Sequence, residues 1–396
     1  MTTRKAQARG RSCRGMWVGL LSAALVVACS TAGNRSAEPL ASLDPDSRAQ
    51  YDDAVATLYG AKDRFQYPAA ADALAQVVNR SPTFAAGRFH WAYALSKLGR
   101  YDDLLVQTAA TTEYADGLSP RQRLWLRALS FRAADEPYKE VEAWSAVTQA
   151  HPEDRWAWYE LASSLSRVER YGEAADAAEK ALALEPDPAR WAASWIYYLH
   201  SKALYRSGQF AAAIPAGANG HSNRSTWRST FYRQALGEAR VNPDRIADLV
   251  NEYRAISAAE GRNNAAYTEA NIALFYYELG DFSVAANFAR ASWDAQPSAY
   301  AAWALAFALT ESGRPEAALA FIDGSAQDFL SNSFLQVARA WALYRVGQLE
   351  AALAALETAD AQSSRWQYLI EFATRTVKRA IEEPDAKPAE PIPWLG

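Results

Sequence analysis

The sequence has little of the residue types that carry metal, thiol or redox chemistry. Its 396 residues include two cysteines and four histidines. Cys13 lies in a basic N-terminal segment that we expect to be cleaved. The mature chain would then have no disulfide, no cysteine metal site and no cysteine nucleophile. The histidines lack a His, Glu or Asp partner at metal-ligand spacing on one helical face; they are His90, His151, His200 and His221.

Motifs that would support catalysis are also missing from the sequence. We find no nucleophile elbow of the G-x-S-x-G type and no glycine-rich phosphate loop. We therefore predict that the protein is not an enzyme and uses no cofactor or metal.

No stretch of any length alternates apolar and polar residues as a half-buried strand would, so we predict an all-α chain. Half of the residues are apolar and 22% are charged, which is typical of a folded protein. A length of 396 residues is too great for one ordinary core, whereas a repeat solenoid grows by stacking.

The segment 155–186 shows the organisation most clearly. Trp158, Leu161, Ala162 and Leu165 recur at i, i+3, i+4 and i+7, which places them on one face of a helix. A turn follows at residues 169–171, and a second helix repeats the spacing with alanines. Small residues suit the crossing, because packed helix axes lie roughly 8–10 Å apart. The segment predicts two short helices joined by a turn, and Pro186 ends the unit.

These residues resemble the tetratricopeptide repeat, a 34-residue helical pair. The positions that match its pattern are Trp158, Leu161, Ala162, Leu165, Tyr171, Ala174, Ala178, Ala181 and Pro186. The same pattern recurs from about Tyr51 to Ser364. Gly280 and Gly313 are 33 residues apart, and Gly313 and Gly347 are 34 apart. The resemblance implies a right-handed α-solenoid of about nine helix pairs, which a capping helix over residues 365–383 would close.

One region interrupts the repeats. Pro215, Gly217 and Gly220 lead us to predict a loop over Ile214–Arg224 rather than a helix, as an insertion between imperfect repeats. A divergent sixth helix pair is predicted at Trp227–Arg240 and Asp244–Ala259.

The N-terminus has the organisation of an export signal. Five cations precede an apolar run over Met16–Ala28 that is too short to span a membrane. Val26-Val27-Ala28-Cys29 resembles the lipobox of bacterial lipoproteins, which implies cleavage before Cys29 and attachment of a diacylglyceryl group to its sulfur, so that the modified residue carries several acyl chains such as palmitate. An ordinary secretory signal is the alternative. Ser30, rather than Asp, resembles the class sorted to the outer membrane, in a cell that has one.

The predicted order is therefore a signal peptide (1–28), a flexible tether (29–48), the solenoid (49–364), the capping helix (365–383) and a proline-rich tail (384–396). Removing the five signal cations from a chain of formal charge −4 leaves −9. An acidic mature chain argues against non-specific binding of nucleic acid.

In the family, the first helix of each pair lines a concave groove. Transferring those positions gives aromatic and cationic side chains, which contribute strongly at interfaces; buried core is the alternative for aromatic residues at helical spacing. The expected groove residues are Phe89, Tyr93, Lys97, Trp125, Arg132, Trp156, Tyr159, Arg167, Trp195, Tyr198, Lys202, Tyr205, Arg206, Tyr277, Trp303, Phe307, Trp341 and Tyr344.

These features lead to two hypotheses. The first is a membrane-anchored scaffold that binds an envelope protein, with the partner's extended or helical segment, containing acidic residues, in the groove. The second is a glycan-binding lipoprotein that stacks aromatic side chains on sugar rings. The Lys and Asn residues by which some family members bind chaperone tails are absent from the corresponding positions, which hold Tyr159, Ser163 and Ser166 in one repeat.

Overall fold

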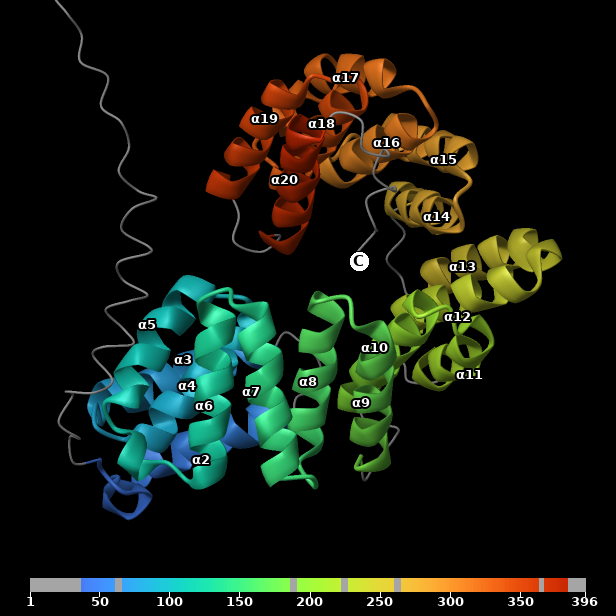
Figure 1. Ribbon diagram of the computed structural model, residues 1–396. Helices are drawn as coiled ribbons and strands as arrows, with labels where there is room; N and C mark the ends of the chain where they lie inside the picture. The colour runs from blue at the N-terminus through green and yellow to red at the C-terminus, as the bar shows by residue number, and fades with distance from the viewer. Residues whose placement is uncertain are drawn as a thin grey trace, which may run out of the picture.

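The computed structural model describes residues 37–60, 66–185, 191–221, 227–259, 265–362 and 367–383. Within these ranges the regular structure is helical and no strand occurs (Figure 1). The helices form nine pairs and a closing helix, as predicted. The pairs are α2 (Pro45–Gly60) with α3 (Gln66–Arg80), α4 (Ala85–Leu98) with α5 (Tyr101–Thr112), α6 (Pro120–Ala133) with α7 (Pro137–Ala150), α8 (Arg155–Arg167) with α9 (Tyr171–Ala183), α10 (Trp191–Arg206) with α11 (Phe210–His221), α12 (Trp227–Val241) with α13 (Ile246–Ala259), α14 (Ala265–Leu279) with α15 (Phe282–Ala295), α16 (Ala299–Glu311) with α17 (Pro315–Asp323), and α18 (Ser333–Arg345) with α19 (Leu349–Gln362); α20 (Gln367–Glu382) is last.

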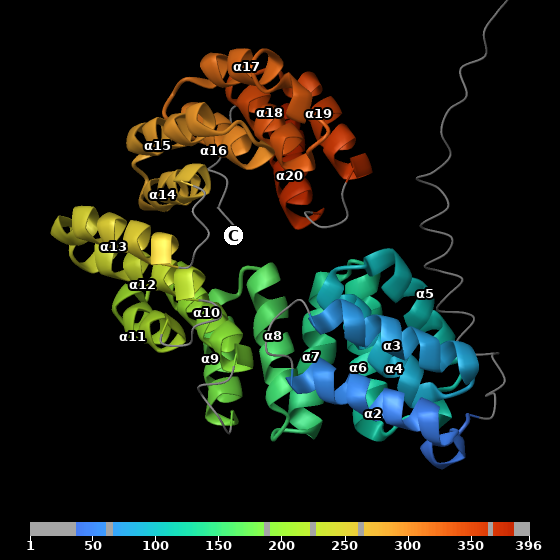
Figure 2. The ribbon, with the colours of Figure 1, turned by 180° about the vertical axis from the view of Figure 1, so that it is seen from behind.

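Each helix packs on its neighbours in sequence, which makes the chain a solenoid. The first helices of successive pairs also touch one another, as in α4 with α6, α10 with α12 and α16 with α18. Figures 1 and 2 show that the stack curves strongly, so that α14–α20 lie above α2–α10 in both views. We call the first helices of the pairs, which contact one another in most successive pairs, the inner layer.

The turns between paired helices need a left-handed residue, and the sequence mostly supplies glycine. Gly99, Gly208, Gly280, Gly313 and Gly347 have φ between 67° and 86° at this place. Asp135 and Glu169 occupy the same place in two pairs, with φ of 53° and 61°. A side chain in this conformation is strained by roughly 1–2 kcal/mol.

The pair α8–α9 confirms the packing logic of the sequence. Ala162 and Ala174 are fully buried, and Leu161 and Leu165 lie in the same core. Asp154 caps the start of α8 by accepting hydrogen bonds from the backbone N–H groups of Trp156 and Ala157.

The loop predicted at Ile214–Arg224 is wrong over residues 214–221, which belong to α11; residues 222–224 lie outside the described ranges. Pro215 has no backbone N–H, so α11 lacks one hydrogen bond at this position. Because Pro215 is exposed, the gap lies on the solvent side of the helix. A Cβ on Gly217 would come within 2.7 Å of the backbone nitrogen of Gln234 on α12. Gly217 therefore serves a close contact between α11 and α12 rather than a loop.

The described core divides into two clusters that meet within α14. One runs from Leu43 to Phe275, and the other from Ala273 to Val377. Ile272 and Phe275 belong to the first cluster, whereas Ala273 and Leu274 belong to the second. Helix α14 thus joins an N-terminal part to a C-terminal part.

Ordered structure begins earlier than the predicted tether boundary at residue 48. Helix α2 starts at Pro45, and both Leu43 and Ser47 are buried. The predictions for the signal peptide, for Cys29 and for the tail at 384–396 lie outside the described residues. Among the helices of the described ranges, none combines the length and apolar character needed to cross a membrane.

Candidate functional site

The expected groove residues divide into two equal groups by exposure. Those that are buried are Phe89, Tyr93, Trp125, Arg132, Tyr205, Tyr277, Trp303, Phe307 and Trp341. Those that are partly exposed are Lys97, Trp156, Tyr159, Arg167, Trp195, Tyr198, Lys202, Arg206 and Tyr344. Most of the second group lies on α8 and α10.

Burial corrects the expectation that the first group lines an open surface. Trp125 is fully buried and packs edge-to-face on Trp144, with ring centroids 5.1 Å apart. Phe89 approaches Trp125 at 6.2 Å. The first helices pack against each other along the inner layer, so side chains at these repeat positions fill the space between helices. Ligand binding by the partly exposed group stays a prediction.

Two aromatic pairs recur at the same spacing on adjacent first helices. On α8, Trp156 meets Tyr159 edge-to-face at 6.0 Å, and on α10 Trp195 meets Tyr198 at 5.9 Å. All four side chains are partly exposed, and α8 packs against α10. We call these four residues the aromatic face. Arg155 lies over the Trp156 ring at 4.8 Å and adds a cation–π contact.

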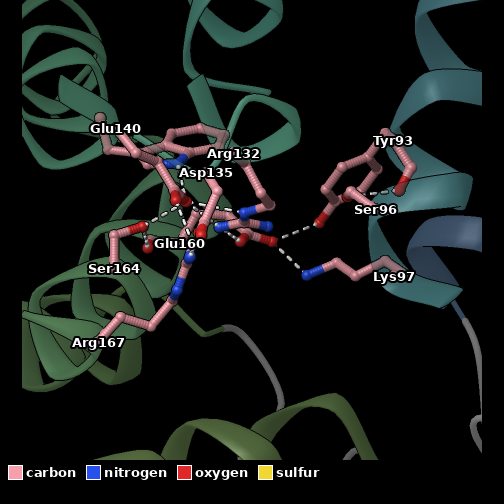
Figure 3. A network of polar contacts seen from close by, with 10 residues as sticks. Tyr93, Ser96, Lys97, Arg132, Asp135, Glu140, Glu160, Ser164 and Arg167 are labelled. Carbon is pink, nitrogen blue, oxygen red and sulfur yellow. Dashed lines mark hydrogen bonds and ion pairs between the residues drawn. The ribbon is translucent and has the colours of Figure 1, made fainter. Parts of the chain in front are cut away.

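A charged network joins α4, α6, α7 and α8 beside this face (Figure 3). Arg132 Nη2 lies 2.6 Å from a carboxylate oxygen of Glu140 and 2.8 Å from one of Glu160. Lys97 also pairs with Glu160, and Arg167 pairs with Glu140 at 2.5 Å and Asp135 at 2.9 Å. Ser164 and Tyr93 donate hydrogen bonds to the two glutamates. We call Lys97, Arg132, Asp135, Glu140, Glu160 and Arg167 the balanced network.

The balanced network has three cations and three carboxylates, so its charges cancel. Burial alone would raise the pKa of Glu160, but Lys97 and Arg132 outweigh it and lower that pKa to about 2. Burial lowers the pKa of Lys97, against the attraction of Glu160. Each charge has a partner within the network, so we assign it a structural role: it fixes three first helices relative to one another.

A second group of charges lies on α10, α12 and α14. It comprises Lys202, Arg206, Arg233, Arg240 and the single carboxylate of Glu278, and we call it the cation cluster. Arg206 pairs with the Glu278 carboxylate at 2.7 Å, and Arg240 donates to the Glu278 backbone carbonyl at 2.7 Å.

Two tyrosine hydroxyls also contact the cation cluster. Arg233 is almost fully buried and donates to the hydroxyl of Tyr198 at 3.2 Å, while Arg240 donates to that of Tyr205 at 3.1 Å. Burial alone would raise the pKa of Tyr198, but Arg233 and Lys202 outweigh it and lower that pKa below its ordinary value. Burial lowers the pKa of Lys202 to about 8, and the repulsion of Arg233 and Arg206 adds to this effect.

A smaller charged group on α16 and α18 is again neutral. Arg345 pairs with Glu311 at 2.9 Å, and the indole N–H of Trp341 donates to the same carboxylate. Tyr344 stacks at a tilt on Trp341.

Sequence reasoning missed Arg233, Arg240 and Glu278, as well as Glu140 and Glu160. The divergent sixth pair gave no register from which groove positions could be transferred. Arg233 and Arg240 are seven residues apart, which places both on one face of α12. This spacing is the sequence signal that could have revealed them as a pair. Glu160 stands in the middle of an otherwise apolar face of α8, which marks it as a buried acid.

The described residues contain no group of three or more His, Cys, Asp or Glu side chains that could hold a metal ion. His90 is buried and hydrogen-bonded to Tyr51 at 2.9 Å, and burial lowers its pKa to about 4. A neutral histidine that is enclosed in this way is a packing residue.

Comparison with known proteins gives one family match and several similar solved structures. Residues 157–188 match the tetratricopeptide repeat family. No curated protein matches the sequence. Similar solved structures include the TPR domain of P58(IPK), with 16% identity, 94% of this chain and 98% of that chain covered, and a TM-score of 0.28. A tetratricopeptide repeat protein from Parabacteroides merdae is 11% identical, with 83% and 99% covered and a TM-score of 0.37. YrrB, described as a TPR protein with an unusual peptide-binding site, is 16% identical, with 58% and 96% covered and a TM-score of 0.31.

The family match falls on α8 and α9, the pair that carries half of the aromatic face and one side of the balanced network. The chain therefore contains a tetratricopeptide repeat at residues 157–188, within a solenoid whose described ranges form nine helix pairs and a closing helix.

Proposed function

We propose that the protein is a scaffold that binds a segment of another protein on the inner layer of its solenoid. The aromatic face is the observation that carries this proposal. Helices α8 and α10 each carry an edge-to-face Trp–Tyr pair at the same spacing. All four side chains remain partly exposed although α8 and α10 pack together.

Aromatic pairs at regular spacing suit an extended or helical peptide. Trp and Tyr supply large contact areas with few rotatable bonds, and they are enriched among the residues that dominate binding energy. The cation cluster follows the aromatic face along the solenoid through Tyr198, which belongs to one and contacts the other. This arrangement favours a partner whose segment carries apolar residues followed by acidic ones.

The balanced network supports the proposal by keeping the face rigid. It ties α4, α6 and α8 through buried ion pairs on the side from which the Trp156–Tyr159 pair projects. A rigid face loses less entropy when a ligand binds, and preorganisation of this kind increases affinity.

We further propose that this scaffold is lipid-anchored in the cell envelope, on the periplasmic face of the outer membrane in a cell that has one. The support is the lipobox-like Val26-Val27-Ala28-Cys29 and the following Ser30. Cys29→Ser would remove the acylated sulfur and release the protein to the soluble fraction. Persistence of the variant in membranes after a high-salt wash would contradict the anchor.

Affinity capture tests the scaffold. Residues 37–396, immobilised without the lipid, would be exposed to solubilised envelope and eluted with rising salt. We expect one partner protein at stoichiometric yield, and its loss when both Trp156→Ala and Tyr198→Ala are present. Recovery of polysaccharide with no enriched protein would contradict the scaffold and favour stacking on sugar rings. Equal capture by the double variant would contradict the aromatic face as the binding surface.

A further inference from the structure

The solenoid is most thinly joined between α13 and α14. These two helices touch each other less than any other two consecutive helices of the described ranges, whereas α14 packs closely on α15 and α16. The core divides at the same helix, since one buried cluster ends at Phe275 and the other begins at Ala273. We call α2–α13 the N-terminal part and α14–α20 the C-terminal part. Relative movement is the default for two parts of a chain that share a small interface.

The interface between these parts also contains a cavity. Its walls come from α12, α13 and α14, and include Ala235, Val250 and Phe275, one from each helix. Tyr232 of α12 lies in the same wall, and its hydroxyl is buried without a hydrogen-bond partner in the described part of the chain. Close packing and complete hydrogen bonding are what make a protein interior rigid, and both are deficient at this place.

Polar contacts hold α14 near its two ends. Near its start, Glu269 accepts two hydrogen bonds of 3.0 Å from Arg254 of α13. Near its end, the Glu278 carboxylate pairs with Arg206 of α10 at 2.7 Å, and the Glu278 backbone carbonyl accepts a hydrogen bond of 2.7 Å from Arg240 of α12. We call these the end contacts of α14. Because hydrogen bonds weaken steeply with distance and angle, the end contacts stabilise one particular arrangement of the two parts.

We propose that the junction of α12, α13 and α14 is a hinge, about which the C-terminal part moves as one body, and that the end contacts at Glu269 and Glu278 stabilise the arrangement in Figure 1. Figures 1 and 2 show α14–α20 above α2–α10, so a rotation at α14 changes how far the C-terminal part stands from α8 and α10. The hinge therefore sets how much room a partner segment finds beside the aromatic face.

Distances between two spin labels test the hinge directly. The sequence has cysteine only at positions 13 and 29, so a protein of residues 37–396 is labelled solely at the cysteines that are introduced. Double electron–electron resonance then gives the distribution of distances between the two labels. The measurement uses the protein alone, without a partner.

Two label pairs are matched in span. Lys180→Cys on α9 with Glu357→Cys on α19 crosses α14, whereas Asp72→Cys on α3 with Asn251→Cys on α13 lies within the N-terminal part. All four positions are exposed, and each pair joins helices ten places apart in the chain. We expect a distribution roughly twofold broader for the pair that crosses α14. Equal widths for the two pairs would overturn the hinge.

Glu278→Gln should broaden the distribution for the crossing pair further, because it removes the ion pair with Arg206. Glu311→Gln is the matched control. Glu311 pairs with Arg345 at 2.9 Å within the C-terminal part, and its side chain is 5% exposed against 4% for Glu278. The control should lower the melting temperature similarly but leave the distances between the parts unchanged. An equal broadening in both variants, or none in Glu278→Gln, would overturn the role of this end contact.

Val250→Ile should act in the opposite direction. It adds one methylene group at the cavity wall, which improves the packing of α13 on α14, so the distribution for the crossing pair should become narrower. Val337→Ile, at a fully buried valine of α18, is the control and should leave the width unchanged. An unchanged or broader distribution in Val250→Ile would contradict a hinge at the cavity. Circular dichroism checks the folding of each variant, and the two wild-type label pairs decide the hinge even where a variant fails to fold.

The hinge and the proposed function fail independently. The aromatic face lies wholly on α8 and α10 of the N-terminal part, so a rigid junction would leave the scaffold proposal intact. A broad distribution for the crossing pair, together with no captured partner, would keep the hinge and remove the scaffold.

Discussion

Arg132 on α6 places a guanidinium nitrogen 2.8 Å from the carboxylate of Glu160 on α8, and both side chains are buried. This contact links two first helices of successive pairs. A buried ion pair adds little net stability compared with an apolar pair, but removal of one partner leaves an uncompensated charge. The balanced network is thus a set of connections that specifies the helix arrangement and that is costly to break.

Protonation of Glu160 should destabilise the protein in acid. Its folded pKa of about 2 lies below the ordinary value of 4.5, so its contribution is complete above about pH 4.5 and is lost as the pH falls toward 2. The difference corresponds to about 3 kcal/mol. Urea unfolding measured between pH 7 and pH 2 would show the loss.

The variant Glu160→Gln tests whether protonation of Glu160 causes the loss of stability in acid. It should cost roughly 3–5 kcal/mol at pH 7, because Lys97 and Arg132 lose their shared partner, and it should flatten the decline between pH 4.5 and 2. Glu142→Gln, at an exposed glutamate on α7, is the control and should keep the decline. A wild-type-like decline in Glu160→Gln would show that another carboxylate is responsible.

Glu169→Gly should stabilise the α8–α9 turn. Glu169 is exposed and has φ of 61°, a conformation that glycine adopts without strain, so we expect a gain of about 1 kcal/mol. Gly99→Ala makes the opposite change, from glycine to a residue with a side chain. A Cβ there meets no atom within 4 Å, so only the φ of 67° opposes it. This variant should lose a similar amount of folding free energy. Thermal melting of both variants would show whether the shifts have opposite signs.

Gly217→Ala should loosen the contact between α11 and α12. The added Cβ would lie 2.7 Å from a backbone nitrogen of Gln234, which cannot move without moving the helix, so we expect a loss of roughly 1–3 kcal/mol. Gly172→Ala on α9 meets nothing within 4 Å and should be neutral or slightly stabilising. Equal melting temperatures for the two variants would contradict the close crossing.

Substitutions at the aromatic positions should separate binding from folding. Trp156→Ala should lower the affinity for the captured partner by at least tenfold. The melting temperature should change little, because the Trp156 side chain is partly exposed. Trp125→Ala, at a fully buried side chain of the same predicted groove set, should cost roughly 3–5 kcal/mol of folding free energy. Binding assays paired with urea unfolding would distinguish these outcomes. A large stability loss in Trp156→Ala would place it with the core.

Much of the fold followed from local pattern. The spacing of Leu161, Ala162 and Ala174 predicted the α8–α9 pair, and the glycine repeat predicted the turns and the number of pairs. Pro215 and its neighbouring glycines were misinterpreted, because residues that favour a loop can also permit a close helix crossing. The difference lies in what packs against them, which no local pattern contains.

The sequence by itself determined the helix pairs, because apolar periodicity and turn residues act over distances of a few residues along the chain. Only the tertiary structure decided which aromatic side chains stay exposed, since Trp125 and Tyr159 are 34 residues apart, at the same repeat position, yet Trp125 is buried and Tyr159 is partly exposed. It also brought together charges that no local pattern connects. Arg233 and Arg240 lie on α12 of the divergent sixth pair and Glu278 lies on α14, and they interact only because α10, α12 and α14 hold them at separations over which Coulomb interactions are strong.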